Sequence, residues 1–448
     1  MFENPRWRVG YATVGLFVLL AGDALRFTVG WWVFSILTVA VTIVSLWLLF
    51  AERHRWRVNH LPYPLLLFLA LATVSIVWSH YPASTALGLF TTWVIVVNGV
   101  AFAIALSWTQ LLGALSHVLR FVIGASLLFE LFVSTVIRAR VLPLFGQPGV
   151  DYGSYKHIPG MLMWSRNELF DVFGTGRIQG ILGNSNSLGF LALLGLIVFS
   201  IQFATHSDSR RTPGGRGWSR SRRASGVWIV LAAASILMTK SATVTLALVG
   251  VVIVAVVVLS IRRAHTPRGR TIVASVTALA VVAVGVVLVL FRGEVLALLG
   301  KSSDLTGRLG IWRAVIGLAQ ERPVFGWGWI SYWVPWADPF DHLVYRAKVL
   351  QLQAHNTWLD VVFQLGIVGL VVFVLLVAVT AVKAWQHAVD RPQSVPMAPQ
   401  SYTAITMLGL LILTALIVQS FAESRLITEY GLALLVVVAV KTKRRELL

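Results

Sequence analysis

The chain has 448 residues, of which 57% are hydrophobic and only 12% are charged, and its formal net charge is +19. A soluble domain carries about 25% charged residues, so this composition excludes an ordinary soluble protein and indicates a multi-pass membrane protein. The sequence has no cysteine, which excludes a disulfide framework and a thiolate metal site. The basic residues gather in short loops between apolar runs, as the positive-inside rule predicts, so the charge does not indicate nucleic-acid binding.

Apolar runs that suit membrane-spanning helices recur along the whole chain, since a helix needs about 20 residues to cross a bilayer. The short alternating segments of a barrel are missing, so we predict an all-α polytopic membrane bundle. The first run lacks a cleavage site and is expected to be a transmembrane helix, not a signal peptide. About twelve spans are expected by length and hydropathy, at residues 9–25, 29–50, 63–78, 85–106, 111–136, 188–203, 227–238, 244–261, 272–291, 358–381, 404–421 and 427–440.

The basic clusters predict which side of the membrane each loop occupies. Both termini and the arginine-rich loops at 53–57, 210–223 and 262–270 should be cytoplasmic, and the second of these is predicted to be flexible. Two long loops then lie outside, and the larger is expected to contain amphipathic helices. The predicted parts are an N-terminal bundle (1–137), a first extracytoplasmic loop (138–186), a second bundle (187–292), a large extracytoplasmic loop (293–357), and C-terminal spans with a basic tail (358–448).

Residues 307–320 are predicted to form an amphipathic helix in the larger loop. Apolar side chains recur there at helical spacing, Thr306 suits the cap, and Pro323 ends the pattern. Arg308 would therefore lie in the first turn, where its planar guanidinium suits a diphosphate. The alternative is an interfacial helix whose arginines contact lipid phosphates.

His355 lies just before the span at 358–381, at the height of the membrane surface. A histidine there can exchange a proton near neutral pH, although a purely structural role is the alternative. Asn356 could orient either the imidazole or a substrate hydroxyl. In the first loop, Arg177 is a second outer cation, and Asn184, Ser185 or Asn186 could simply cap the next helix.

Lys240, at the tip of the hairpin between residues 238 and 244, is a third outer-surface cation, or a lysine that only snorkels. The outer loops also contain Asp304, Glu321, Asp338 and Asp341, but no carboxylate pair or histidine pair at ligand spacing. We therefore expect no metal site. No nucleophile motif supports Ser-His-Asp catalysis.

Together, these segments resemble the O-antigen ligase and polymerase family of bacterial membrane glycosyltransferases, between residues 177 and 369. The upstream element is Arg177-x-x-Gly180 followed by Asn184 to Asn186, and Lys240-Ser241 is similar to a basic tip. The larger loop matches through Gly307-Arg308 with Trp312, Pro323 with Gly326-x-Gly328, His355-Asn356 with Leu359, and Gly366-x-x-Gly369.

The resemblance implies a transferase that takes a glycan from a polyprenyl diphosphate in the outer leaflet, without a metal ion, cofactor or nucleotide sugar. Arg177, Arg308 and Lys240 would neutralise the diphosphate, and His355 would act on the acceptor hydroxyl. Supporting or substrate contacts would come from Asn356, Asn186, Trp312 and Arg313. The acceptor would be a glycan, a lipid or a cell-wall polymer, and the protein would lie in the bacterial cytoplasmic membrane with its site facing outside.

Two features depart from the family pattern. Many members carry a glutamate where this chain has Gln364, so the acidic partner of His355 is not identified. The tryptophans are unusually dense and would form a sugar-stacking platform or, as we expect, an interfacial belt; they are Trp327, Trp329, Trp333 and Trp336.

Two other functions stay open. A polymerase would join lipid-linked repeat units on the same carrier. A lipid-linked glycan transporter or flippase should instead place charged residues at mid-membrane, whereas most ionisable residues here lie in loops or at predicted interfaces. The transferase interpretation requires Arg177, Arg308 and His355 to converge.

Overall fold

The computed structural model describes twelve stretches of the chain, which are residues 5–54, 56–147, 149–171, 173–174, 176–208, 216–264, 266, 268–273, 275–276, 307–346, 348–390 and 402–444. The protein is mainly helical, as predicted. Among the described residues, paired strands are confined to a short antiparallel hairpin of β1 (Tyr345–Arg346) and β2 (Val349–Leu350), and one isolated bridge joins Val141 to Ser165.

The N-terminal helices are α1 (Pro5–Leu20), α2 (Gly22–Ala51), α3 (Tyr63–Val74), α4 (Pro82–Ala105) and α5 (Trp108–Phe132). The first two predicted spans are thus joined at Ala21, four residues before the expected end of the first. The sequence analysis predicted no break inside the second span, but α2 has one at Gly30, where φ is +81°. A side chain there would meet the ring of Phe145 as well as the left-handed backbone, so only glycine suits this break.

The remaining long helices are α6 (Ser185–Asp208), α7 (Arg216–Thr239), α8 (Ala242–Arg263), α11 (Arg308–Glu321), α12 (Thr357–Val389), α13 (Leu408–Ser420) and α14 (Glu429–Arg444). The prediction of a flexible loop at 210–223 is wrong for residues 216–223, which form the first turns of α7. Residues 209–215, most of the predicted span at 272–291, and Asp304 and Thr306 lie outside the described residues. Shorter turns are Val58–His60, Ser75–Val77, Val133–Ile137, Tyr152–Ser154, Gly160–Leu162, Gly180–Leu182, Ala404–Met407 and Arg425–Ile427.

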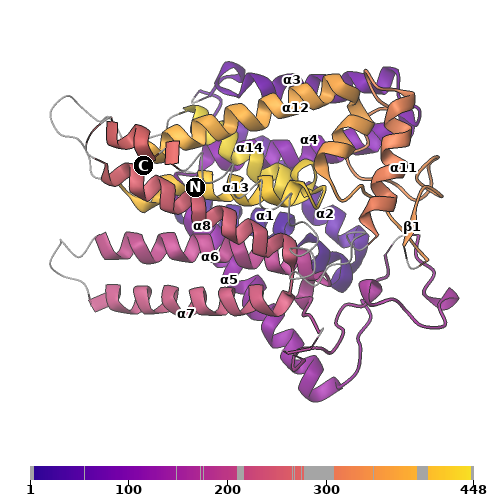
Figure 1. Cartoon of the computed structure of the whole chain (residues 1–448), viewed down its shortest axis with the longest axis horizontal. Helices are drawn as coiled ribbons and strands as arrows, with labels where there is room; N and C mark the ends of the chain where they lie inside the picture. Colours follow the sequence, from indigo (N-terminus) through magenta and orange to yellow (C-terminus); the bar gives the residue numbers. More distant parts are fainter. Residues whose placement is uncertain are drawn as a thin grey trace.

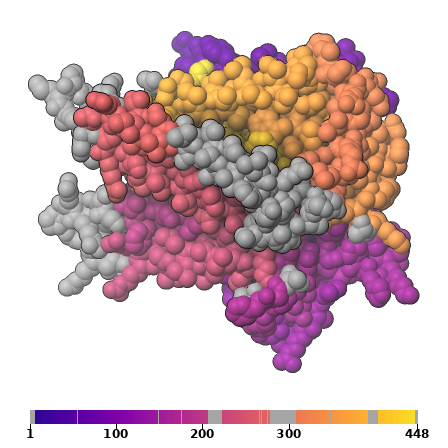
Figure 2. Space-filling model, viewed as in Figure 1, coloured from indigo at the N-terminus to yellow at the C-terminus, as the bar shows by residue number. Residues whose placement is uncertain are grey.

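Six of the described helices are long and apolar enough to cross a membrane: Gly22–Ala51, Pro82–Ala105, Trp108–Ile137, Ser185–Thr205, Ala242–Arg263 and Thr357–Val389. The apolar segments Tyr63–Val77 and Ala404–Ser420 are shorter. Figure 1 shows the long helices side by side, with both chain ends near one end of the bundle and α11 and β1 at the other. In Figure 2 the loop before α6 (purple) and the segment that contains α11 (orange) cover this second end.

The glycine motifs of the larger loop join that loop to a break in α12. Gly366 has a φ of +64° within α12, and the loop at 323–328 fits beside it. Gly328 N donates to Gln364 O at 2.9 Å, and Ile367 N donates to Pro323 O at 2.9 Å. A Cβ on Gly366 would lie 2.2 Å from Val324 O, so the two backbones approach too closely for any other residue. The motif therefore anchors the loop to the start of α12.

Three of the four clustered tryptophans are buried. For these three, both expectations are wrong: they form neither an interfacial belt nor a platform on which a sugar could stack. Their indole N–H groups are bonded inside the protein: Trp327 to Leu318 O at 2.7 Å, Trp329 to Thr92 Oγ1 at 2.9 Å, and Trp333 to Asp360 Oδ1 at 2.9 Å. They form a core beneath the loop because a buried indole gains from both its area and its one hydrogen bond. Trp336 alone is open to solvent, at 64% exposure.

Candidate functional site

His355 is held at the entrance to α12 by contacts on both of its neighbours. Ala354 N donates to Asp360 Oδ2 at 3.1 Å, and Ala354 O accepts from Trp312 Nε1 at 3.0 Å. On the other side, Asn356 Oδ1 caps α12 by accepting from Trp358 N at 3.0 Å and Leu359 N at 3.3 Å. His355 itself has a φ of +51°, so its side chain leaves the backbone where the chain turns into the helix.

The imidazole of His355 bonds to a carboxylate from a distant part of the sequence. His355 Nδ1 lies 2.9 Å from Glu423 Oε2, and Glu423 sits in the turn between α13 and α14. The other oxygen, Glu423 Oε1, accepts from Arg308 Nη2 at 2.9 Å and from Asn186 Nδ2 at 2.8 Å. Glu423 therefore joins residues from three further segments, and we call these four residues with Arg177 the Glu423 cluster.

Glu423 is ionised in this setting. Its side chain is only 8% exposed, and burial alone would raise its pKa. The charge and hydrogen bond of His355, the charge of Arg308 and the bond from Asn186 outweigh that effect and lower the pKa of Glu423 to about 2. The carboxylate consequently stays charged throughout the pH range in which a histidine titrates.

Arg177 enters the cluster through Asn186. Asn186 Oδ1 accepts from Arg177 Nη2 at 3.2 Å and from Ser241 Oγ at 2.9 Å, while its amide nitrogen donates to Glu423. Burial and the nearby Arg166 and Arg308 lower the pKa of Arg177 to about 10, which leaves it protonated at neutral pH. Its buried Nε makes no hydrogen bond to any described residue. Asn186 therefore links the guanidinium of Arg177 to Glu423, the carboxylate that also binds Arg308.

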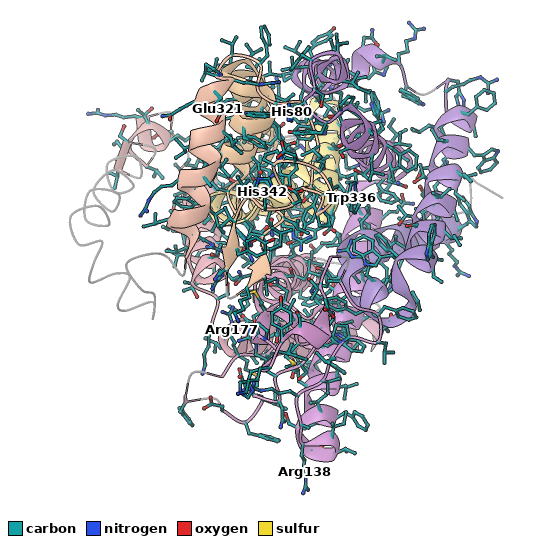
Figure 3. The ribbon with its side chains drawn as sticks, turned by 90° about the vertical axis from the view of Figure 1, so that its right-hand side faces the viewer. His80, Arg138, Arg177, Glu321, Trp336 and His342 are labelled. Carbon is teal, nitrogen blue, oxygen red and sulfur yellow. The ribbon has the colours of Figure 1, made fainter. Side chains whose placement is uncertain are left out.

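The structure brings together four of the predicted site residues, Arg177, Asn186, Arg308 and His355. Figure 3 looks onto this end of the molecule, where Arg177 lies near the lower end of α11 and Arg138 projects away at the bottom. Arg308 is in the first turn of α11, which begins one residue later than predicted. The catalytic roles assigned to these residues stay predictions.

The other predicted site residues lie around the cluster. Trp312 and Asn356 hold the backbone on either side of His355, and the side-chain oxygen of Asn356 caps a helix, so it is not the predicted contact to the ring. Lys240 bends away, because its Nζ donates to Asp171 O at 3.1 Å and to Gly174 O; only its neighbour Ser241 reaches Asn186. Arg313 is exposed on α11.

The sequence interpretation missed Glu423, the acidic partner of His355. Gln364, where the family pattern suggested one, is buried and accepts from Ile330 N and Ser331 N, each at 2.9 Å. One signal was available: Glu423 lies in a short polar turn between two apolar runs, on the side predicted to face outward. Asn184 proved to be the cap of α6, since its side chain accepts from Asn186 N at 2.9 Å.

Two further features lie apart from the cluster. Contrary to the sequence analysis, acids of the outer loop do come together: ligand atoms of Asp338, Asp341 and His342 lie within 4.8 Å of one another on the surface. Ion pairs account for their contacts, including one from His80 Nε2 to Asp338 Oδ2 at 3.2 Å.

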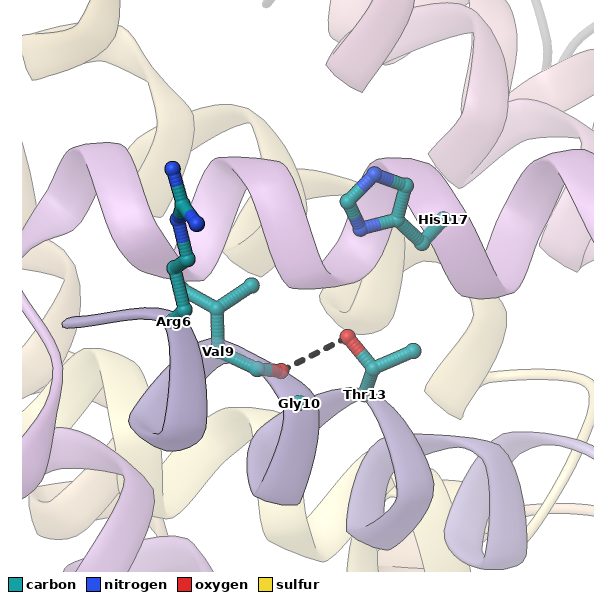
Figure 4. Close-up of a pocket in the computed structure, with 5 residues that line it drawn as sticks. All are labelled: Arg6, Val9, Gly10, Thr13 and His117. Atoms are coloured by element: carbon teal, nitrogen blue, oxygen red, sulfur yellow. Dashed lines mark hydrogen bonds between the residues drawn. The ribbon is translucent and has the colours of Figure 1, made fainter. Parts of the chain in front are cut away.

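A hollow between α1 and α5 (Figure 4) is near the chain ends and is lined by Arg6, Val9, Gly10, Thr13 and His117.

A comparison with known families agrees with the motifs. The sequence model of a family described as O-antigen ligase matches residues 227–374. This range contains Arg308 and His355 and ends inside α12, while Arg177, Asn186 and Glu423 lie beyond it. No curated protein matches the chain. Residues 227–374 are therefore similar to the O-antigen ligase family, and this match supports the family that the motifs predicted.

Proposed function

We propose that this protein is a membrane glycosyltransferase that moves a glycan from a polyprenyl diphosphate to an acceptor hydroxyl outside the cytoplasmic membrane. The match of residues 227–374 to the O-antigen ligase family supports a glycosyltransferase-like enzyme of ligase or polymerase type. The observation that most supports the specific reaction is the Glu423 cluster, which places one imidazole and two guanidinium groups around a single buried carboxylate.

His355 is the proposed general base. Because Glu423 is a charged acceptor, it favours the tautomer in which His355 Nδ1 carries the proton. The lone pair is then on Nε2, which is free to receive the proton of an acceptor hydroxyl. The acceptor oxygen attacks the anomeric carbon, the bond from that carbon to phosphate breaks, and its electron pair leaves with the diphosphate.

Arg177 and Arg308 are the proposed clamp for that leaving group. Each guanidinium has five N–H donors, and the bonds to Asn186 and Glu423 use only part of them. Cations fixed where negative charge develops usually supply the largest catalytic term. Lys240 is left as a minor candidate, since carbonyl groups already hold its ammonium.

The alternatives differ in what they ask of this site. A polymerase would use the same cluster with a lipid-linked acceptor, so only the acceptor distinguishes it from a ligase. A flippase would need charged groups along mid-membrane. Here Glu423 lies in a turn, Arg308 starts α11 and His355 precedes α12, so the placement of the charges favours a transferase over a flippase.

Replacing Arg308 by lysine should raise the donor KM and lower kcat/KM by about 10–100-fold, because one charge-assisted bond is worth about 1.5–3 kcal/mol. A lysine keeps the charge but cannot present a bidentate fork. Transfer from a labelled lipid-diphosphate donor, measured with purified protein in lipid, checks this. Arg138→Lys is the matched control, because that arginine projects away from the cluster (Figure 3). Wild-type kinetics for Arg308→Lys would reject the proposal that Arg308 binds the donor diphosphate through a bidentate contact.

The natural lack of cysteine allows the proposed orientation to be tested with single introduced thiols. Trp336→Cys should react with a membrane-impermeant maleimide in intact spheroplasts, since Trp336 is 64% exposed on the larger loop, which is predicted to lie outside. Arg53→Cys, in a predicted cytoplasmic loop, should react only after the membrane is permeabilised. The opposite labelling pattern would place the site in the cytoplasm and end the proposal of an outward-facing enzyme.

A further inference from the structure

A second charged cluster adjoins the first. Asp23 and Arg26, in the first turns of α2, meet Arg425 and Glu429 from the start of α14 and the turn before it. Arg26 Nη2 lies 2.8 Å from Glu429 Oε1, and Arg425 Nη2 lies 3.3 Å from Asp23 Oδ2. Arg26 also pairs with Asp23, and Arg425 with Glu429. These four residues, called the charge quartet below, carry no net charge together.

The charge quartet is tied to the Glu423 cluster by short connections. Arg425 follows Glu423 by two residues in the same turn. The start of α2 packs beside the segment that leads to Asn186, because a Cβ on Gly183 would lie 2.4 Å from the ring of Phe27. The two clusters therefore share one end of the bundle.

Tyr332 connects the quartet to the surroundings of His355. Asp360, which accepts a hydrogen bond from the neighbouring Trp333, also accepts one from Ser424 Oγ, and Ser424 immediately precedes Arg425 of the quartet. Trp333 bonds to Asp360 Oδ1, and Asp360 Oδ2 accepts from Ala354 N, the residue before His355. Tyr332 is 44% exposed, and its hydroxyl makes no hydrogen bond within the part of the chain that the structure describes.

Stability alone gives a weak reason to keep such a quartet, because the desolvation of enclosed ion pairs largely cancels their attraction. The carboxylate side of the quartet is partly open: the side chains of Glu429 and Asp23 are 27% and 20% exposed, while those of Arg26 and Arg425 are 10% and 12% exposed. Two carboxylates can accept hydrogen bonds from sugar hydroxyls, two guanidinium groups can donate them, and an exposed aromatic ring offers a face for a sugar ring.

We propose that the charge quartet and Tyr332 form the acceptor subsite, which binds an uncharged, polyhydroxylated saccharide beside His355. This inference rests on the proposed function and adds the class of acceptor to it. Because the quartet has no net charge, it would favour a neutral sugar over a phosphate-rich acceptor, whereas the excess positive charge of the Glu423 cluster suits the donor diphosphate.

Binding without turnover tests the subsite separately from the reaction. Short uncharged oligosaccharides of glucose, galactose, mannose or arabinose are titrated in turn against the full chain in lipid nanodiscs. At least one should bind the wild type, and Tyr332→Ala should raise its Kd by about tenfold, which is about 1.4 kcal/mol. Tyr332→Phe, which keeps the ring and the packing, should raise the Kd less, and Trp336→Ala, an exposed aromatic on the same loop, should not change it.

The subsite is rejected if none of these sugars binds, or if Tyr332→Ala and Tyr332→Phe both bind like the wild type. A transfer assay on the same preparations separates the two proposals. Sugar binding that depends on Tyr332 without any transfer would retain the subsite and reject the transferase. Transfer with an unchanged acceptor KM in both Tyr332 variants would retain the transferase and reject the subsite.

Discussion

Replacing His355 by alanine is expected to abolish glycan transfer while the protein still folds and inserts into the membrane. Among the described residues, the imidazole bonds to Glu423 alone, and the neighbouring backbone is held independently by Trp312, Asp360 and Asn356. General-base catalysis contributes about 10²–10⁴-fold to a rate, so the loss of Nε2 removes most of the turnover. The measurement is the release of polyprenyl diphosphate from a labelled donor, together with the expression and size-exclusion profile of each variant.

A second substitution, His355→Asn, separates the loss of the catalytic base from backbone strain at this position. His355 has a φ of +51°, a conformation that alanine adopts poorly but asparagine tolerates. His355→Asn should therefore fold at least as well as His355→Ala and be equally inactive, because an amide cannot take up the proton. Normal transfer by either variant would reject His355 as the base.

Glu423→Gln should lower kcat by about 10²–10⁴-fold, the range typical of general-base catalysis. A glutamine can present its amide N–H to Nδ1, which moves the imidazole proton to Nε2 and leaves no lone pair for the acceptor, as in a triad whose aspartate becomes asparagine. Donor affinity should hold or improve, since the substitution removes a negative charge beside Arg308. The separate kcat and donor KM values, measured at saturating acceptor, check both effects.

Glu321→Gln is the control, because this exposed acid at the end of α11 has no bond to the cluster among the described contacts. Since the pKa of Glu423 is about 2, the activity of the wild type should show no loss from protonation of this carboxylate between pH 5 and 8. A Glu423→Gln variant with unchanged kcat, or one whose donor KM rises with kcat intact, would mean that Glu423 only supports the fold.

The helical fold was predictable because hydropathy and length are local properties of a sequence. The amphipathic segment predicted at 307–320 is α11, Arg308–Glu321, since its apolar spacing and Pro323 define the helix without reference to other segments. Burial was harder to predict. Trp329 and Trp333 look like membrane-interface residues in the sequence, but partners on α4 and α12 bury them.

The long-range contacts of the candidate site could not be predicted in this way. His355 and Glu423 are separated by 68 residues, and Arg26 and Glu429 by 403, so no periodic pattern relates them. The resemblance to a family pointed to Arg177, Arg308 and His355, but it gave no acid for the imidazole. Only the packing of α13 and α14 against the start of α12 brings Glu423 to the histidine.

The fate of the donor tests the central proposal most directly. Purified protein in nanodiscs would receive a polyprenyl-diphosphate glycan labelled in both the lipid and the sugar, with acceptor saccharide present. We predict that one polyprenyl diphosphate is released for each glycan that becomes attached to acceptor. A donor that stays intact under these conditions, or that crosses the membrane of a sealed vesicle with its glycan still on the carrier, would contradict a transferase.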